Sequence, residues 1–175
     1  MCNFLSVYNN SDFRNFTLVI NYDLKGSYDS PFYSLTEDLV IVDFGIVIGP
    51  ECHSLDYLFY WCANLTRIPD FDISHVTSLC YTFAYCSSLS ELPELRTSGV
   101  EDMTGMLAGC RALTQIPEFE TSRVQDMSYM FEGCFNLRSV PRLDTSSLLF
   151  ANYMFHGCSA LTSVPCFFLE NVITA

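Results

Sequence analysis

Five of the nine cysteines in this chain follow one another at a constant interval of 24 residues. They are Cys62, Cys86, Cys110, Cys134 and Cys158. A leucine stands three residues after each of these cysteines, and a proline stands seven residues after each. A fixed period of roughly 20–50 residues is the signature of a stacked architecture, in which each copy buries its apolar face against the next. The sequence therefore predicts a solenoid.

Each predicted repeat has two parts. The first part alternates apolar and polar residues, as in 113–119, and this period of two favours a short strand. The second part, for example 126–134, favours a helix of two turns, with Asp126 as its N-cap and Gly133 at its C-terminal end. Its apolar residues share one helical face: Met127, Met130, Phe131 and Cys134. We therefore expect an α/β repeat, with a short strand and a short helix in each 24-residue rung.

The period covers most of the chain but not its beginning. We expect a solenoid over residues 38–175, with a degenerate first rung at 38–61, regular rungs from residues 62, 86, 110 and 134, and a half rung from 158. Residues 1–37 are rich in aromatic side chains and contain a β-branched segment at 15–22. They predict a small β-rich N-terminal cap, or a segment that docks the array onto a larger assembly.

The formal net charge of −12 narrows the classes of partner. Phosphate contacts need clustered Lys and Arg, and the chain has 8 of these residues against 20 acids, so we expect no nucleic-acid binding. The first residues lack the features of a signal peptide, and the longest apolar run, 39–48, is about half the length of a membrane span. We expect a chain made in the cytoplasm without a membrane span, with a virus particle and a cell surface both open as destinations.

The cysteines predict buried, reduced thiols. There is no C-x-x-C pair, and a zinc site needs ligands that converge from several directions, whereas these side chains form one column. Neighbouring rungs lie about 5 Å apart, which is within reach of a disulfide, but five cysteines in a row cannot all pair. We expect neither a metal nor a cofactor.

The repeat resembles a known family. The string Val-x-Asp-Met-Ser/Thr-x-Met-Phe/Leu-x-Gly-Cys-x-x-Leu, followed three residues later by an apolar residue and proline, occurs at 100–117 and 124–141. It is similar to the BspA-type leucine-rich repeats of bacterial surface lipoproteins and adhesins, and related repeats occur in some protist and phage proteins. The resemblance covers residues 52–175. It implies a right-handed leucine-rich-repeat solenoid that binds proteins or surfaces without catalysis. Surface members carry an export signal, and we find none in this sequence.

Catalytic motifs are weak. The three histidines, His53, His75 and His156, do not form a helix-spaced metal pair. Cys52, His53 and Asp56 bring a nucleophile, a base and an acid close together in the sequence. Adjacent residues of an extended chain point to opposite sides, however, and Cys52 falls on a core position. We therefore expect no enzymatic activity.

Two columns of variable charged residues are better candidates for binding. One column contains Asp70, Glu94, Glu118 and Arg142, and the other contains Asp72, Arg96, Glu120 and Asp144. Like charges one strand spacing apart repel, so these columns must be solvated or matched by a partner. The sequence leaves both readings open.

The C-terminal half rung is a third candidate. It carries apolar residues at its edge, namely Phe168, Leu169 and Ile173. Either the half rung folds over as its own lid, or a partner covers it, including a second copy of the chain.

These features predict a non-enzymatic module for protein–protein interaction or assembly. Reduced cysteines and attachment surfaces at both ends favour a structural or attachment component of a phage or virus particle. The alternatives are a surface adhesin-type recognition protein and an intracellular binder of a host protein.

Overall fold

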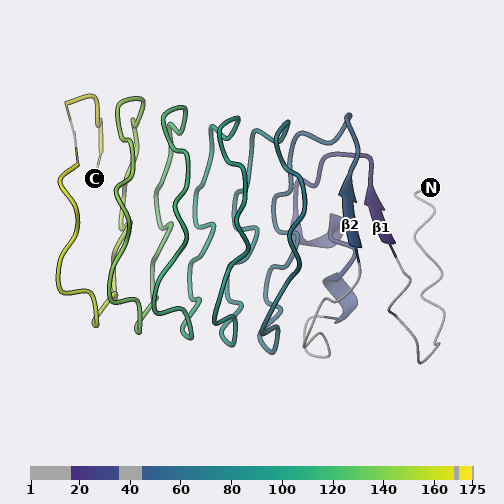
Figure 1. The fold of residues 1–175 in the computed structure, drawn as a ribbon, viewed down its shortest axis with the longest axis horizontal. Helices are drawn as coiled ribbons and strands as arrows, with labels where there is room; N and C mark the ends of the chain where they lie inside the picture. The colour runs from purple at the N-terminus through teal and green to yellow at the C-terminus, as the bar shows by residue number, and fades with distance from the viewer. Residues whose placement is uncertain (1–16, 36–44, 168–169, 175) are drawn as a thin grey trace.

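The computed structural model describes residues 17–35, 45–167 and 170–174. Its first elements are the strand β1 (Thr17–Ile20), the 3-10 helices η2 (Ser27–Asp29) and η3 (Tyr33–Leu35), and the strand β2 (Gly45–Ile48). β1 and β2 pair in parallel (Figure 1). β1 lies within the segment for which the sequence predicts a strand.

From β2 onward the chain is a repeat solenoid. Parallel backbone bridges connect residues that are 24 positions apart, running through Ser54, Ser78, Asp102, Asp126, Phe150 and Thr174. Figure 1 shows the resulting loops stacked side by side along the long axis of the molecule. A further parallel bridge joins Leu24 to Leu55, so the segment that follows β1 lies against the first of these loops. The predicted solenoid is confirmed, whereas the division into a cap at 1–37 and an array at 38–175 stays a prediction.

The predicted helix in each rung is wrong. No α-helix occurs within residues 17–35, 45–167 and 170–174, and the segment 126–134 is a run of consecutive turns. Every second amide of this segment donates to a carbonyl of the next rung at 2.8–3.0 Å; the donors are Met127, Tyr129, Phe131 and Gly133. The amides between them donate to the carbonyl three residues earlier at 3.0–3.2 Å; these are Met130, Glu132 and Cys134.

The turns are preferred because they pair more of the backbone. A helix of two turns leaves four amides and four carbonyls without an intrahelical partner, and a helix this short is unstable alone. A type II turn needs positive φ at its third position, and two of the three turns meet this condition: Tyr129 has φ 61° and Gly133 has φ 68°. The apolar spacing of the segment fits both conformations, because Met127, Met130, Phe131 and Cys134 are all buried.

The predicted strand in each rung is also wrong in detail. Within the described ranges, β1 and β2 are the only strands, although the alternation of burial is present: Phe119 is buried between exposed Glu118 and Glu120. Proline has no amide to donate, and Pro117 interrupts the ladder at this point. Side chains replace some of the missing bonds, as where the Thr97 hydroxyl donates to the Glu120 carbonyl at 3.0 Å.

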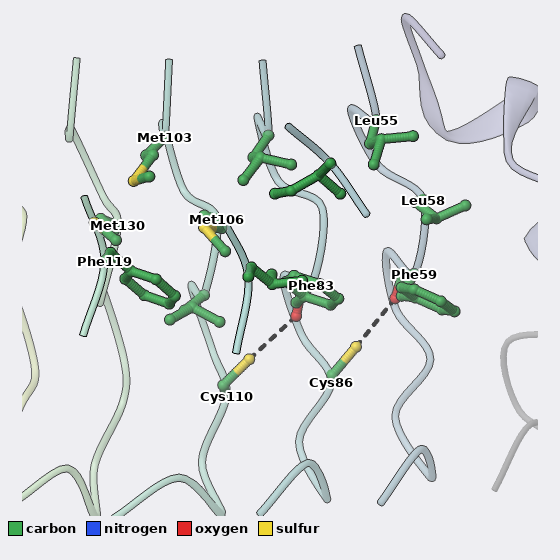
Figure 2. Close-up of a cluster of buried hydrophobic side chains, with 14 of the residues drawn as sticks. Leu55, Leu58, Phe59, Phe83, Cys86, Met103, Met106, Cys110, Phe119 and Met130 are labelled. Atoms are coloured by element: carbon green, nitrogen blue, oxygen red, sulfur yellow. Dashed lines mark hydrogen bonds between the residues drawn. The ribbon is translucent and has the colours of Figure 1, made fainter. Parts of the chain in front are cut away.

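The core consists of columns of identical or similar side chains, one from each rung. Figure 2 shows Phe59 and Phe83, whose rings stack at 5.6 Å, beside the thiols of Cys86 and Cys110. Each of these thiols donates at 3.1 Å to a carbonyl of the preceding rung. The predicted column of thiols is confirmed, with Cys62, Cys86, Cys110 and Cys134 buried and Cys158 half-buried, and all cysteines in the described residues are free.

Candidate functional site: an acidic groove

Six of the predicted binding residues line one groove of about 860 Å³. They come from three successive rungs and are Asp70, Asp72, Glu94, Arg96, Glu118 and Glu120. The two columns that the sequence singles out therefore lie side by side. Among their six charged side chains, only Arg96 is cationic.

Alternation along the chain positions these side chains. Phe71 and Leu95 also line the groove, but they are buried, and each anchors its segment in the core. Because successive residues of an extended segment point to opposite sides, the charged neighbours on either side of Phe71 face solvent. Thr121, at the end of the Glu118 and Glu120 segment, is buried, and its hydroxyl donates to the Asp144 carbonyl of the next rung at 2.9 Å.

Local hydrogen bonds keep one groove carboxylate ionised. The Ser74 amide donates to Asp72 Oδ1 at 2.9 Å, and this bond, together with one to the Ser74 side chain and the charge of Arg96, lowers the pKa of Asp72. The same arrangement recurs in the same column three rungs further on, where hydrogen bonds from Ser146 lower the pKa of Asp144. These carboxylates are fixed negative charges at neutral pH.

The other predicted residues lie elsewhere. Arg142 and Asp144 are exposed on the next rung and do not line the groove. Ile173 is exposed and borders a second hollow of about 500 Å³, next to Leu149 and Asn171. Phe168 and Leu169 lie outside the described residues.

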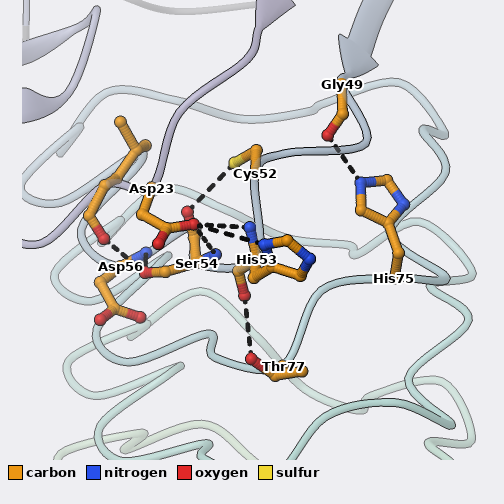
Figure 3. A network of polar contacts seen from close by, with 9 residues as sticks. Asp23, Gly49, Cys52, His53, Ser54, Asp56, His75 and Thr77 are labelled. Atoms are coloured by element: carbon orange, nitrogen blue, oxygen red, sulfur yellow. Dashed lines mark hydrogen bonds and ion pairs between the residues drawn. The ribbon is translucent and has the colours of Figure 1, made fainter.

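The Cys52, His53 and Asp56 arrangement has a structural role (Figure 3). Burial raises the pKa of Cys52 to about 11, which opposes formation of a thiolate nucleophile. The His53 amide donates to Asp23 at 2.6 Å, and this bond ties the segment after β1 to the solenoid. Asp56 accepts bonds from the Ser78 hydroxyl and the Cys80 amide of the next rung. In residues 17–35, 45–167 and 170–174, no group of three or more His, Cys, Asp or Glu could hold a metal ion.

The sequence reading missed a cluster of aromatic residues on the consecutive-turn segments. We define the aromatic patch as Tyr57, Tyr60, Trp61, Tyr81 and Tyr85. Tyr57 and Tyr81 occupy the same column, as do Trp61 and Tyr85. Tyr129 and Tyr153 lie in the same column as Tyr57 and Tyr81, and this recurrence of tyrosine was the sign of the cluster that the sequence offered.

The fold and the groove define a class: a solenoid of stacked 24-residue rungs with a charged lateral surface. The chain belongs to the family described as "Mycoplasma protein of unknown function, DUF285", which matches residues 53–165. Comparison with the curated proteins gives no match.

Among solved structures, the chain is similar to a leucine-rich repeat protein from Eubacterium ventriosum. The two share 18% sequence identity and a TM-score of 0.39, over 73% of this chain and 52% of that chain. The chain thus spans about half the length of the solved protein. In the part of the chain that the structure describes, no helix has the length and apolar character needed to cross a bilayer.

Proposed function

We propose that this solenoid is a non-enzymatic protein-interaction module that binds a basic segment of a partner protein in the acidic groove. The observation that carries the proposal is the convergence of five carboxylates and one guanidinium from three rungs into one groove. A rigid backbone presents these charges at regular intervals, as solenoids do along their binding surfaces.

The charge balance of the groove selects the chemistry of the partner. Complementary charge steers association and discriminates against the wrong partner, because like charges brought together are unfavourable. Arg96 lies between acidic side chains of the groove and can donate hydrogen bonds to a carboxylate of the partner. That contact would fix the position of the partner segment along the groove. The apolar contribution comes mainly from half-buried Pro117, because Phe71 and Leu95 line the groove but are buried.

The narrower prediction of a structural or attachment component of a phage or virus particle stays a prediction, as do the surface adhesin-type and intracellular alternatives. Association through the C-terminal half rung and docking through residues 1–37 also stay predictions. All of these are uses of a binding module, and identification of the native complex would separate them.

The test is a titration with a dodecapeptide in which lysine alternates with serine, and with its glutamate counterpart. We expect the lysine peptide to bind saturably and the glutamate peptide not to bind. In the double variant Glu94→Gln/Glu118→Gln the affinity for the lysine peptide should fall about tenfold, which corresponds to about 1.4 kcal/mol. The matched control is Glu51→Gln/Glu91→Gln, which removes two exposed charges outside the groove. Equal weakening in the control would show that only net charge matters and would contradict the proposal.

A further inference from the structure

The aromatic patch forms a compact cluster of five rings in mutual contact. Tyr57 stacks on Tyr81 with ring centroids 5.4 Å apart, and Trp61 stacks on Tyr85 at 4.9 Å. Tyr60 stands between these two stacks, with its plane at 75–89° to all four other rings. Aromatic pairs of this kind hold each other in place, so the cluster is preorganised.

The patch exists despite a backbone that favours glycine. Six non-glycine residues of the described ranges have positive φ, and all six are aromatic: Tyr57, Trp61, Tyr81, Tyr85, Tyr129 and Tyr153. Bulky residues in this conformation are outliers, and each costs about 1–3 kcal/mol. Glycine fills the same columns in other rungs, at Gly105 and Gly109 for example. The fold does not need aromatic side chains here, so the rings have another role.

Among the described residues, ring stacking covers one face of half-buried Tyr57 and one face of Trp61, whereas Tyr81 and Tyr85 are covered on both faces. A Cβ added to Gly105 would lie 2.3 Å from the Tyr81 ring, and one added to Gly109 would lie 2.6 Å from the Tyr85 ring. Tyr81 is therefore covered on one face by Tyr57 and on the other by Gly105. In the same way, Trp61 covers one face of Tyr85 and Gly109 covers the other. Among the described residues, Trp61 is stacked on one face only, by Tyr85, and 53% of its surface is exposed.

The charge around the patch is negative. The turn segments 54–61, 78–85, 102–109, 126–133 and 150–157 contain four carboxylic acids and no Lys or Arg. Burial raises the pKa of Tyr85, and Tyr60 and the carboxylate of Glu132 raise it further. Burial likewise raises the pKa of Tyr57, with a contribution from the acid Asp56. The Glu132 carboxylate thus acts on the Tyr85 hydroxyl, and a cation at the patch meets no Lys or Arg of the turn segments.

We propose that the open face of Trp61, with the Tyr60 ring as a perpendicular wall, is a docking site for an arginine side chain of a partner protein. A guanidinium is planar, is weakly hydrated and stacks on aromatic faces, most favourably on tryptophan. The chain already contains such a pair, since the Arg111 guanidinium lies 5.4 Å from the centre of the Phe135 ring. A polysaccharide would need a row of open ring faces, and Tyr81 and Tyr85 are covered.

This site is separate from the acidic groove. Phe71 and Leu95 enter the core from the groove segments, whereas Phe59 and Phe83 enter it from the turn segments that carry the patch. The outward-facing residues of these two sets of segments therefore lie on different sides of the core. A groove that recognises its partner by charge should bind lysine and arginine with similar affinity. An aromatic ring should distinguish them, because only arginine stacks well on a ring.

Trp61 is the only tryptophan of the chain, so its fluorescence reports on this site directly. The experiment is a titration of the whole protein with a dodecapeptide in which arginine alternates with serine. Its lysine and glutamate counterparts and hexa-N-acetylglucosamine are titrated in parallel. We expect a saturable change in emission with the arginine peptide, and an affinity at least about tenfold lower for the lysine peptide. The response to the arginine peptide should be unchanged in Glu94→Gln/Glu118→Gln.

The variants are taken from the chain's own repeats. Tyr60→Ala introduces the residue found at Ala84 and Ala108 in the same column, and Tyr85→Gly introduces that of Gly109. Each should weaken the arginine response about tenfold, whereas the control Tyr153→Gly, in the column of Tyr57 but several rungs away, should not. A second measurement, thermal unfolding followed by circular dichroism, shows that each variant is folded.

Three results would overturn the proposal. The first is the absence of a saturable response to the arginine peptide in a folded protein. The second is a response that arginine and lysine peptides share and that Glu94→Gln/Glu118→Gln abolishes, which would assign the binding to the groove. The third is a response to the oligosaccharide alone, which would make the patch a sugar site.

Discussion

The thiol of Cys110 donates a hydrogen bond of 3.1 Å to the backbone carbonyl oxygen of Phe83, in the preceding rung. The same bond recurs from Cys134 to Leu107 at 3.1 Å. A buried thiol that donates to a carbonyl keeps its proton and is therefore a poor nucleophile, since the thiolate is the reactive form.

The thiol column should therefore resist alkylation. Burial raises the pKa of Cys62 and Cys134 to about 12, and Cys166 is exposed. With iodoacetamide at pH 8, followed by peptide mass spectrometry, we expect Cys166 to react in the folded protein and the column cysteines to react only in denaturant. Labelling of Cys110 at the rate of Cys166 would contradict the buried column.

Two glycines of the same column separate backbone strain from steric contact. Gly133 has φ 68°, and an added Cβ would meet nothing closer than 3.7 Å. Gly133→Ala should therefore cost only the left-handed conformation, about 1–2 kcal/mol. Gly109→Ala should cost more in urea unfolding, because its Cβ would also come within 2.6 Å of the Tyr85 ring. Equal losses in the two variants would show that the ring yields without cost.

The strained tyrosines should reverse the usual order of alanine and glycine. Tyr153 has φ 55° and is 60% exposed. We expect Tyr153→Gly to be more stable than Tyr153→Ala by about 1 kcal/mol, because only glycine adopts this conformation freely. The comparison is made by chemical unfolding of the two variants under the same conditions. A more stable alanine variant would mean that this residue leaves the left-handed region.

Two aspartates should give opposite pH dependences. Burial raises the pKa of Asp56, so its ionisation in the folded state is unfavourable and stability falls as pH rises above 3.8 through the raised value. Asp56→Asn should therefore gain stability relative to the original protein as pH increases over that range. Asn152 occupies the same column, which shows that the site accepts an amide.

Asp72 has the opposite sign. The Ser74 amide lowers its pKa, so the ionised form contributes stability above the unfolded value near 3.8, and that contribution is lost as pH falls through the lowered value. The difference between the original protein and Asp72→Asn should therefore vanish in acid. Urea unfolding between pH 3 and 7 measures both differences, and parallel pH profiles for the two variants would contradict these assignments.

The sequence predicts the stacking and the buried positions but not the conformation of each rung. Met127, Met130 and Phe131 have the spacing of a helical face, and the same residues are buried in a run of turns whose alternate amides bond to the next rung. Periodicity reports which residues face the core, and it cannot tell a short helix from turns stabilised by a neighbouring copy. The groove was predictable because Asp70 and Glu94 share a column. The tyrosine column of the patch was visible in the sequence, but the left-handed backbone of Trp61 and the exposure of its ring were not.

The direction of the hydrogen bonds along the turn segments has a consequence for the whole array. In the first four of these segments four alternate, odd-numbered amides donate forward, as from Leu79, Tyr81, Phe83 and Tyr85 to carbonyls of the following rung. The peptide dipoles along this strip add together, much as they do in a helix, with the partial positive charge directed toward the C-terminal side. The strip is thus electrically polar. Two arrays can therefore continue one another along the strip only head to tail, since in the opposite arrangement amides would face amides.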